Sequence, residues 1–432
     1  MTPDDGVTPD DGVTPDDGVT PDDGVTPDDG VTPDEASDHP AIEGPAAATE
    51  GELDQPPRRT GPVMRLLAIA RDPVWLDAIA PTVLLRVVIL LFGVAAVVVF
   101  RGDALPHGSL LEIWDRWDAP HFFEVARLGY GPPADPARIV LFPALPALIA
   151  LVSLMTEPLV AGMVISFIST LAAAIGLYRL VRFDEGRESA RAAVLFKSLF
   201  PTAFTLIAPY SEAPFLAFTV WSFVMARQSR WPAAGLFALF AGATRIQGAF
   251  LLPALILEYW LSKRRIDRGA AVLLLAAGGP LIYLWINFAT FGDPLYFIGI
   301  QNTVFHVSTA APWVAIPNIV NGAIAFQPTE FWATVYFAPL AALVILLAVA
   351  VWTIFGRGSR PSYAVYTILS LLSFASLSWP ISVPRYLMGV FPIFMAAGRI
   401  GRIPWLGPPL LAGSTLLFGV CVTLFVTGHW AF

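Results

Sequence analysis

Two carboxylates and an imidazole lie close together in one polar segment, LEIWDRWDAPHFFEVARLGYG, which runs from Leu111 to Gly131. Asp115, Asp118 and His121 recur there at intervals of three. On a helix or its leading turn, this spacing places all three side chains on one face. Such a face could take a proton from a substrate or hold a divalent cation.

A structural role for Asp118 competes with the catalytic one. Aspartate is a favoured N-cap and proline is tolerated in a first helical turn. Asp118 could therefore cap a helix that begins at Ala119 and Pro120 and ends at Gly129. The two roles are compatible, because a capping carboxylate at a helix start is also well placed for chemistry.

Glu212, in the motif PYSE, is expected at a break between two membrane spans, where a carboxylate is costly unless it is paired or functional. It either starts a helix or faces Asp115 and Asp118 across a site. In the second case the three carboxylates would repel one another, so a divalent cation held by them or a raised pKa would be expected. No cofactor other than this metal ion is indicated.

Arg245 and Arg385 fall at the ends of apolar runs, away from the other arginine clusters. The planar donors of a guanidinium match a phosphate group, which makes both residues candidates for binding one. The alternative for each is a structural salt bridge or a side chain that snorkels to the membrane surface.

Composition separates an acidic tail from an apolar body. Of 432 residues, 56% are apolar and 14% are charged, the mean hydropathy is +0.64, and Cys421 is the only cysteine. An ordinary soluble domain and a disulfide scaffold are both excluded. Residues 1–54 hold 17 of the 34 acidic side chains and no Lys or Arg, so the remainder carries a net charge of +9. We expect residues 1–57, with their TPDDG repeats, to be a disordered cytoplasmic tail, because they offer almost nothing to bury.

The rest of the chain, 58–432, reads as an all-α polytopic membrane domain. Apolar runs long enough to cross a bilayer, roughly 17 to 25 residues each, predict about eleven spans. Two outer loops, 101–140 and 290–330, separate some of them, and the proline-containing stretch 139–155 is expected to be re-entrant or interfacial. The spans are expected at 81–100, 159–180, 190–208, 211–227, 232–246, 248–262, 269–289, 331–355, 362–378, 385–399 and 404–427.

The arginines set the expected orientation. Clusters that precede the first span and follow several later ones fit one side of the membrane, whereas 290–330 contains no Lys or Arg. By the positive-inside rule, the N-terminus is cytoplasmic and the two outer loops face away from the cytoplasm.

Several segments resemble the PIG-V family, which adds the second mannose in glycosylphosphatidylinositol assembly, and its prokaryotic relatives. That family shows a pattern close to RWD, two residues, HF, then GY, then FFP, with later elements that contain APYSE, AGLTR, and RY followed by FP. The corresponding segments here are RWDAPHF (116–122), GY (129–130), LFPALP (141–146), FPTAFTLIAPYSEAPFLAFT (200–219), AGATRIQGAF (241–250) and SVPRYLMGVFPIF (382–394).

The resemblance implies a GT-C-type bundle and an inverting glycosyltransferase of the plasma membrane, acting on its extracytoplasmic face. Mannose would pass from a polyprenyl-phosphate-mannose donor to a lipid-linked or glycan acceptor, with no role for nucleic acid. It implies that Asp118 is the catalytic base, with Asp115 and His121 beside it. Residues in or beside the matching motifs are candidates for substrate binding: Glu212, Arg385, Arg245, Tyr210 and Tyr386.

Two alternatives remain open at the level of sequence. One is a GT-C enzyme for another sugar, such as arabinose. The other is a transporter or lipid flippase without catalysis, since charged groups within spans also suit a substrate path. A transporter's charges would gather near the middle of the bilayer, whereas the candidates above map to its outer edge, which favours an enzyme.

Overall fold

The computed structural model describes residues 73–101, 110–327, 329, 332–356 and 358–432. All of them belong to one compact unit, Thr60–Phe432. The expected tail, 1–57, and the arginines that precede the first span lie outside these residues. The described chain is helical, apart from one isolated bridge between Thr309 and Leu377.

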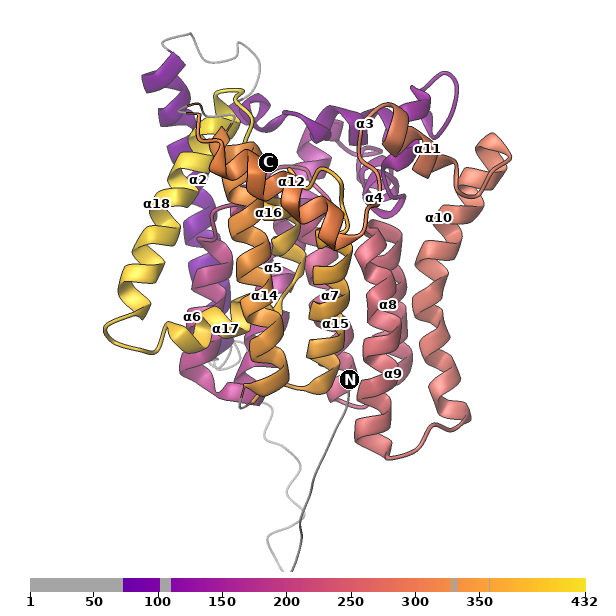
Figure 1. Cartoon of the computed structure of the whole chain (residues 1–432), viewed down its shortest axis with the longest axis vertical. Helices are drawn as coiled ribbons and strands as arrows, with labels where there is room; N and C mark the ends of the chain where they lie inside the picture. Colours follow the sequence, from indigo (N-terminus) through magenta and orange to yellow (C-terminus); the bar gives the residue numbers. More distant parts are fainter. Residues whose placement is uncertain (1–72, 102–109, 328, 330–331, 357) are drawn as a thin grey trace, which may run out of the picture. The chain divides into compact units, whose positions relative to one another are not determined.

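Among the described residues, five helical segments are long and apolar enough to cross a membrane. Each coincides with a predicted span, and Figure 1 labels their α-helical parts. Three of them begin with a short π or 3₁₀ segment. They are η1 (Trp75–Ile79) with α2 (Ala80–Arg101), α5 (Pro158–Glu185), η6 (Arg268–Leu274) with α10 (Leu275–Phe291), η7 (Ala333–Phe337) with α14 (Ala338–Phe355), and α18 (Gly407–Val426).

The other six predicted spans fall on shorter helices, so the count of eleven stays a prediction. Four of them are single helices and two are broken. They are α6 (Arg187–Ser198) with η4 (Ala203–Leu206), α7 (Glu212–Arg227), α8 (Trp231–Thr244), α9 (Leu251–Lys263), α15 (Pro361–Ala375), and α16 (Val383–Tyr386) with η8 (Leu387–Gly389) and α17 (Pro392–Ile400).

The two broken segments have a local cause and a shared setting. Pro201 follows α6 and Pro392 opens α17, and proline can neither donate a backbone N–H nor fit inside a continuing helix. Both breaks lie among buried residues. Irregular backbone at membrane depth is tolerated where protein surrounds it, because its polar groups then find partners away from lipid.

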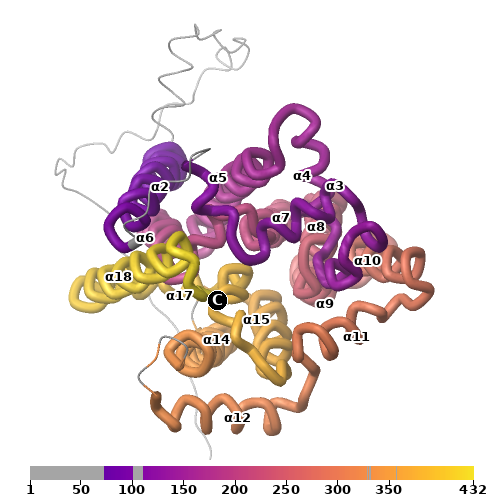
Figure 2. Tube along the Cα trace, turned by 90° about the horizontal axis from the view of Figure 1, so that it is seen from above, coloured from indigo at the N-terminus to yellow at the C-terminus, as the bar shows by residue number. Residues whose placement is uncertain are grey.

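α7 occupies the middle of the bundle and fixes the position of Glu212, its first residue. Figure 2 shows α7 between α5 and α8, with α9 and α15 close by. The broken segment η8 packs tightly on it, since a Cβ on Gly389 would lie 2.5 Å from Phe215 Cε1. This close approach brings Arg385, four residues before Gly389, next to the start of α7.

One end of the bundle, uppermost in Figure 1, carries short helices on loops. α4 has nine residues, so it is about 14 Å long and too short to cross a hydrocarbon core of about 30 Å. It packs on α3 and α5 through Phe122, Leu145 and Ile165, as expected of a re-entrant or interfacial helix. The elements at this end are η2 (Leu110–Trp114), α3 (Asp118–Leu128), η3 (Pro136–Val140), α4 (Ala144–Val152), η5 (Ile246–Phe250), α11 (Tyr296–Thr303) and α12 (Pro312–Ile324).

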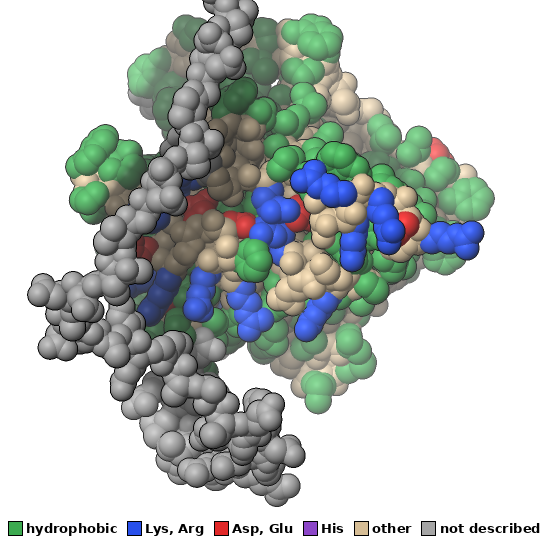
Figure 3. Space-filling view, turned by 90° about the horizontal axis from the view of Figure 1, so that it is seen from below, with side chains coloured by type: hydrophobic (Ala, Val, Ile, Leu, Met, Phe, Trp, Pro, Cys, Tyr) green, Lys and Arg blue, Asp and Glu red, His purple; other side chains and the backbone are tan. Residues whose placement is uncertain are grey.

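The opposite end is basic. Viewed from that side, Lys and Arg side chains spread over the helix ends and turns (Figure 3). The turns between α5 and α6, α7 and α8, α9 and η6, α14 and α15, and α17 and α18 supply them: Arg182, Arg187, Arg230, Lys263, Arg264, Arg265, Arg268, Arg360, Arg399 and Arg402. The charge asymmetry expected from the sequence is thus an asymmetry between the two ends of the bundle.

Candidate active site at the upper end

Four charged side chains from four distant segments meet at the upper end. Arg385 donates from Nη1 to Asp118 Oδ2 at 2.6 Å, although the two residues are 267 positions apart. Arg245 donates from Nη1 to Glu212 Oε1 at 2.6 Å and to Ser211 Oγ at 3.0 Å. Glu212 Oε1 also lies 2.9 Å from Arg385 Nε, as an ion pair without hydrogen-bond geometry. The two carboxylates and two guanidiniums alternate, so the cluster is neutral as a whole.

Local backbone structure places each member. Asp118 and Glu212 are the first residues of α3 and α7, and Arg385 is the third residue of the short α16. Arg245 follows the last residue of α8 in an extended conformation, which turns the chain out of the helix. Four helix ends therefore converge, because α7 at the centre packs against α8 and η8.

Burial differs sharply along the cluster. The Glu212 side chain is 2% exposed, and those of Arg385 and Arg245 are 11% and 12% exposed. Asp118 is 35% exposed. The two arginines and Glu212 are thus buried and held in place by one another. Asp118 is the member of the cluster that a ligand can reach.

Two tyrosines complete the site. Tyr386 lies under both guanidiniums, with its ring centroid 4.5 Å from Arg245 Cζ and 5.6 Å from Arg385 Cζ. Tyr210 also lies against Arg385, at 5.3 Å, and its hydroxyl donates to the Arg116 carbonyl at 3.1 Å. The Asp118 backbone N–H in turn donates to the same hydroxyl at 3.4 Å. Tyr210 therefore holds the backbone on either side of Trp117.

The start of α3 differs from the sequence expectation. Trp117, not Asp118, occupies the N-cap position, with φ 54° and ψ −104°, and no side chain caps the helix. The Asp118 carboxylate pairs with Arg385 instead, so the capping interpretation is wrong. The end of the helix is as expected, since Gly129 has φ 75° and donates to the Val125 carbonyl. The left-handed Trp117 packs edge-on against Trp430, with ring centroids 5.2 Å apart.

Asp115 does not share a helical face with the other two predicted residues. It follows η2 and is separated from α3 by the left-handed Trp117. Its Oδ1 is buried with no hydrogen-bond partner, and desolvation raises the pKa of its carboxyl. His121 does lie one turn after Asp118 on α3. Partial burial, followed by the charge of Arg138, lowers the pKa of its imidazole, while Asp118 acts in the opposite direction.

The structure gives no support to the metal site expected at Asp115, Asp118 and Glu212. Within the described parts of the chain, no three His, Cys, Asp or Glu side chains are placed to hold a metal ion. Arg385 lies between Asp118 and Glu212 and supplies the positive charge that a cation was expected to supply.

The structure also reveals two buried cations that the sequence analysis did not single out. Arg86 and Lys197 are 7% and 0% exposed, within the predicted spans 81–100 and 190–208. The signal was available, because a Lys or Arg inside an apolar run is rare and costly.

The comparisons with known proteins found no matching family model and no matching curated protein. Membership of the PIG-V family therefore stays a prediction. Similar solved structures include the Archaeoglobus fulgidus oligosaccharyltransferase in complex with Zn and sulfate, at 12% identity and a TM-score of 0.43, covering 80% of this chain and 53% of that one. The same enzyme tethered to an acceptor peptide with the NVT sequon gives 11% identity and a TM-score of 0.42, covering 84% and 56%.

A third similar structure is the archaeal oligosaccharyltransferase AglB from Archaeoglobus fulgidus in complex with an inhibitory peptide and a dolichol-phosphate. It is 13% identical, with a TM-score of 0.39, and the match covers 80% of this chain and 55% of that one. The chain spans about half the length of these solved chains. Similarity at this level carries no argument about function, which rests on the site itself.

Proposed function

We propose that this protein is a membrane-embedded inverting glycosyltransferase that takes a sugar, mannose in the first instance, from a polyprenyl-phosphate donor. The observation that carries the proposal is the convergence of Asp118, Arg385, Glu212 and Arg245 at one end of a bundle with five apolar, membrane-length helices. A lipid-phosphate donor has its phosphate at the membrane surface and its tail in hydrocarbon. A site at the end of the bundle suits both parts.

The two arginines fit the donor phosphate. A guanidinium has five N–H donors, and the contacts described above use Nη1 of each arginine and, in an ion pair, Nε of Arg385. The Nη2 groups remain available to phosphate oxygens. During transfer the phosphodiester becomes a monoester and gains negative charge, which fixed guanidiniums would stabilise. Glu212 would keep both arginines oriented in the empty site.

Asp118 is the proposed base. The acceptor hydroxyl oxygen attacks the anomeric carbon, the bond from that carbon to the phosphate oxygen breaks, and the polyprenyl phosphate leaves with the electron pair. The hydroxyl proton passes to Asp118, the most exposed carboxylate of the cluster. An arriving phosphate would compete for Arg385 and so loosen its hold on Asp118 when the base is needed. His121, one turn further along α3, would orient the acceptor or share the proton.

The basic end of the bundle would face the cytoplasm and the site the opposite side of the membrane, in accord with the positive-inside rule. A transporter or flippase is less well supported. The charges on Arg86 and Lys197 line a small cavity of about 20 Å³, which is no larger than one or two water molecules need.

The test is transfer from radiolabelled polyprenyl-phosphate-mannose to endogenous acceptors in membranes that contain the protein. Asp118→Asn should lower transfer by about 10²- to 10⁴-fold, the usual worth of a general base. Donor KM should change far less than kcat. Asp267→Asn, a cap at the opposite end whose Oδ1 accepts from the Gly269 N–H, is the matched control and should transfer normally. Absence of labelled product with the wild type would refute the proposed transferase activity. Transfer by Asp118→Asn above about a tenth of the wild-type rate would refute the role of Asp118 as the general base.

A further inference from the structure

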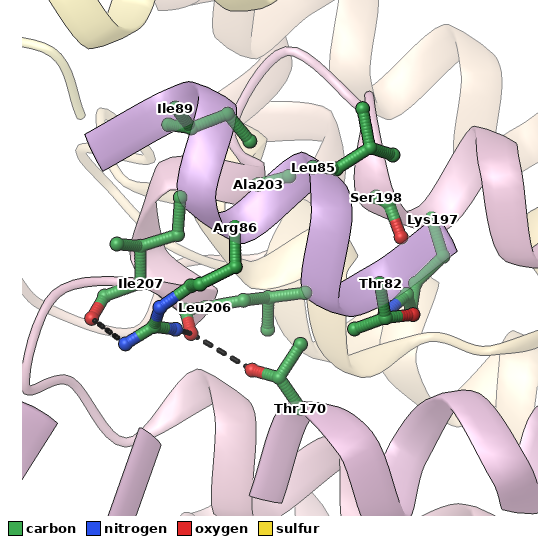
Figure 4. Close-up of a pocket in the computed structure, with 10 residues that line it drawn as sticks. All are labelled: Thr82, Leu85, Arg86, Ile89, Thr170, Lys197, Ser198, Ala203, Leu206 and Ile207. Atoms are coloured by element: carbon green, nitrogen blue, oxygen red, sulfur yellow. Dashed lines mark hydrogen bonds between the residues drawn. The ribbon is translucent and has the colours of Figure 1, made fainter. Parts of the chain in front are cut away.

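A small cavity lined by buried residues lies inside the bundle, away from the proposed active site. α2, α5, α6 and η4 surround it, and its volume is about 20 Å³ (Figure 4). Lys197 is the eleventh residue of α6, so the cavity lies about 15 Å along that helix from its first residue. The lining residues are Thr82, Leu85, Arg86, Ile89, Thr170, Lys197, Ser198, Ala203, Leu206 and Ile207.

The cavity has two cations and no carboxylate in its lining. Arg86 is satisfied by carbonyls, since it donates to Leu206 at 2.9 Å, Ile207 at 3.1 Å and Met163 at 3.2 Å. Lys197 is fully buried, and its Nζ has no hydrogen-bond partner in the part of the chain that the structure describes. Among the described residues, no Asp or Glu forms an ion pair with either side chain within 4.0 Å. An ammonium ion taken out of water without a counter-charge costs several kcal/mol.

Two hydroxyl groups in the lining are also unpartnered. Thr82 Oγ1 and Ser198 Oγ are buried and make no hydrogen bond, in residues that are 3% and 9% exposed. Figure 4 shows Lys197 reaching toward Thr82, with Ser198 on the same side of the cavity, whereas the Arg86 guanidinium is turned to the Leu206 and Ile207 carbonyls. Buried polar groups normally have partners. Lys197 Nζ can only donate and both hydroxyls can donate, so one acceptor placed in the void would give all three groups a partner.

Size and charge select the occupant. One water needs about 10–15 Å³, so the cavity has room for one particle of about that size, which is smaller than a phosphate or a carboxylate group. A water molecule would satisfy hydrogen bonds but leave the Lys197 charge uncompensated beside Arg86. A small monovalent anion satisfies both requirements.

We propose that this cavity is a structural chloride site, in which Lys197 Nζ, Thr82 Oγ1 and Ser198 Oγ donate to one buried chloride ion. The ion would join α2 to α6, which are not otherwise held together there by a pair of opposite charges. It would have a structural role, since it would compensate the buried charge of Lys197.

Equilibrium binding of ³⁶Cl⁻ to the full-length protein, purified in detergent with gluconate as the other anion, tests the proposal. Wild type should bind close to one chloride per chain, saturably, and its unfolding temperature should rise with chloride at constant ionic strength. Lys197→Met should abolish both effects. Lys263→Met, at the exposed end of α9, changes the only other lysine of the chain and should preserve both.

Lys197→Met could fail to fold, so a second variant keeps the test decisive. Thr82→Val with Ser198→Ala removes two donors at nearly constant volume and leaves the charge, and it should weaken chloride binding at least tenfold. Absence of saturable chloride binding in the wild type would show that the cavity holds water or an uncharged lysine, and would overturn the proposal. Binding unchanged in the double variant would overturn it equally.

Discussion

Glu212 offers a sharp test of how the proposed site is built. Its side chain is 2% exposed and its Oε1 lies 2.6 Å from Arg245 Nη1 and 2.9 Å from Arg385 Nε. Glu212→Gln keeps the shape and one carbonyl acceptor but removes the charge between two buried guanidiniums. The variant therefore tests the electrostatic role and leaves packing nearly unchanged.

A matched control residue lies toward the opposite, basic end of the bundle. Glu258 is also 2% exposed and lies between two arginines, with Oε1 2.8 Å from Arg360 Nη2 and 3.7 Å from Arg227 Nε. Ser362 Oγ donates to its other oxygen at 2.6 Å. Glu258→Gln is the same chemical change in an equally buried setting, far from the proposed chemistry.

The expected loss of stability follows from the geometry. At the effective dielectric constant of about 20 that suits protein sites, each contact of 2.6 to 2.9 Å has a gross attraction of about 6 kcal/mol. Most of that offsets the desolvation of the charges, and removing one partner of a buried pair typically costs about 3–5 kcal/mol. We expect the free energy of unfolding of each variant to fall by the lower of these values, about 3 kcal/mol, because glutamine still accepts a hydrogen bond.

Thermal unfolding and sugar transfer together separate stability from function. Both variants should unfold several degrees below the wild type. At a temperature well below both midpoints, Glu258→Gln should transfer sugar normally. Glu212→Gln should lose about 10²-fold in kcat/KM, the effect of an angstrom-scale displacement of positioning groups. Equal transfer by the two folded variants would refute the idea that Glu212 orients the phosphate-binding arginines.

The other predictions concern topology, the tail and pH. Thr309 and Ser262 are both exposed. A cysteine at Thr309 should react with an impermeant thiol reagent added outside intact cells, and a cysteine at Ser262 should not. The reverse pattern would show that the protein has the opposite membrane orientation. Deleting residues 2–54 should leave transfer intact, and a loss with normal membrane insertion would give the repeats a role. The pKa of His121 is lowered in the folded state, so the unfolded chain takes up a proton at this residue more readily than the folded protein does. The free energy of unfolding should therefore fall as the pH drops below about 6.5. Wild type should therefore lose more of its unfolding temperature between pH 7.5 and 5 than His121→Gln, and equal losses would contradict this.

The sequence analysis named the four residues of the charged cluster but not the contacts between them. Asp118, Glu212, Arg245 and Arg385 all came from motif resemblance or from their places at the ends of apolar runs, and the structure brings them together. Their pairing could not be predicted, because it depends on how four helix ends pack around α7. A carboxylate and an arginine 267 positions apart carry no local sign of contact.

Local spacing misled where the backbone is irregular. An interval of three places residues on one face only if the helix continues through them, and Trp117, at φ 54°, interrupts it between Asp115 and Asp118. Residues other than Gly, Asn and Asp rarely adopt positive φ, so a tryptophan gives no warning of such a break. Tyr210, which contacts the backbone on both sides of Trp117, lies 92 positions beyond Asp118.

Charge balance distinguishes the proposed active site from the cavity beside Arg86 and Lys197 and indicates a different role for each. At the upper end, Glu212 and Asp118 neutralise Arg245 and Arg385, so the site needs no ligand to balance its charge, and a phosphate would compete with Asp118 for Arg385. Such a site binds and releases, as turnover requires. Around Lys197 the described residues supply no negative charge, so that cavity is complete only with a ligand present. A ligand that competes for the Arg385–Asp118 ion pair can bind and leave, as a substrate must. A buried charge without a counter-charge, as at Lys197, suits an ion that stays bound in the folded protein.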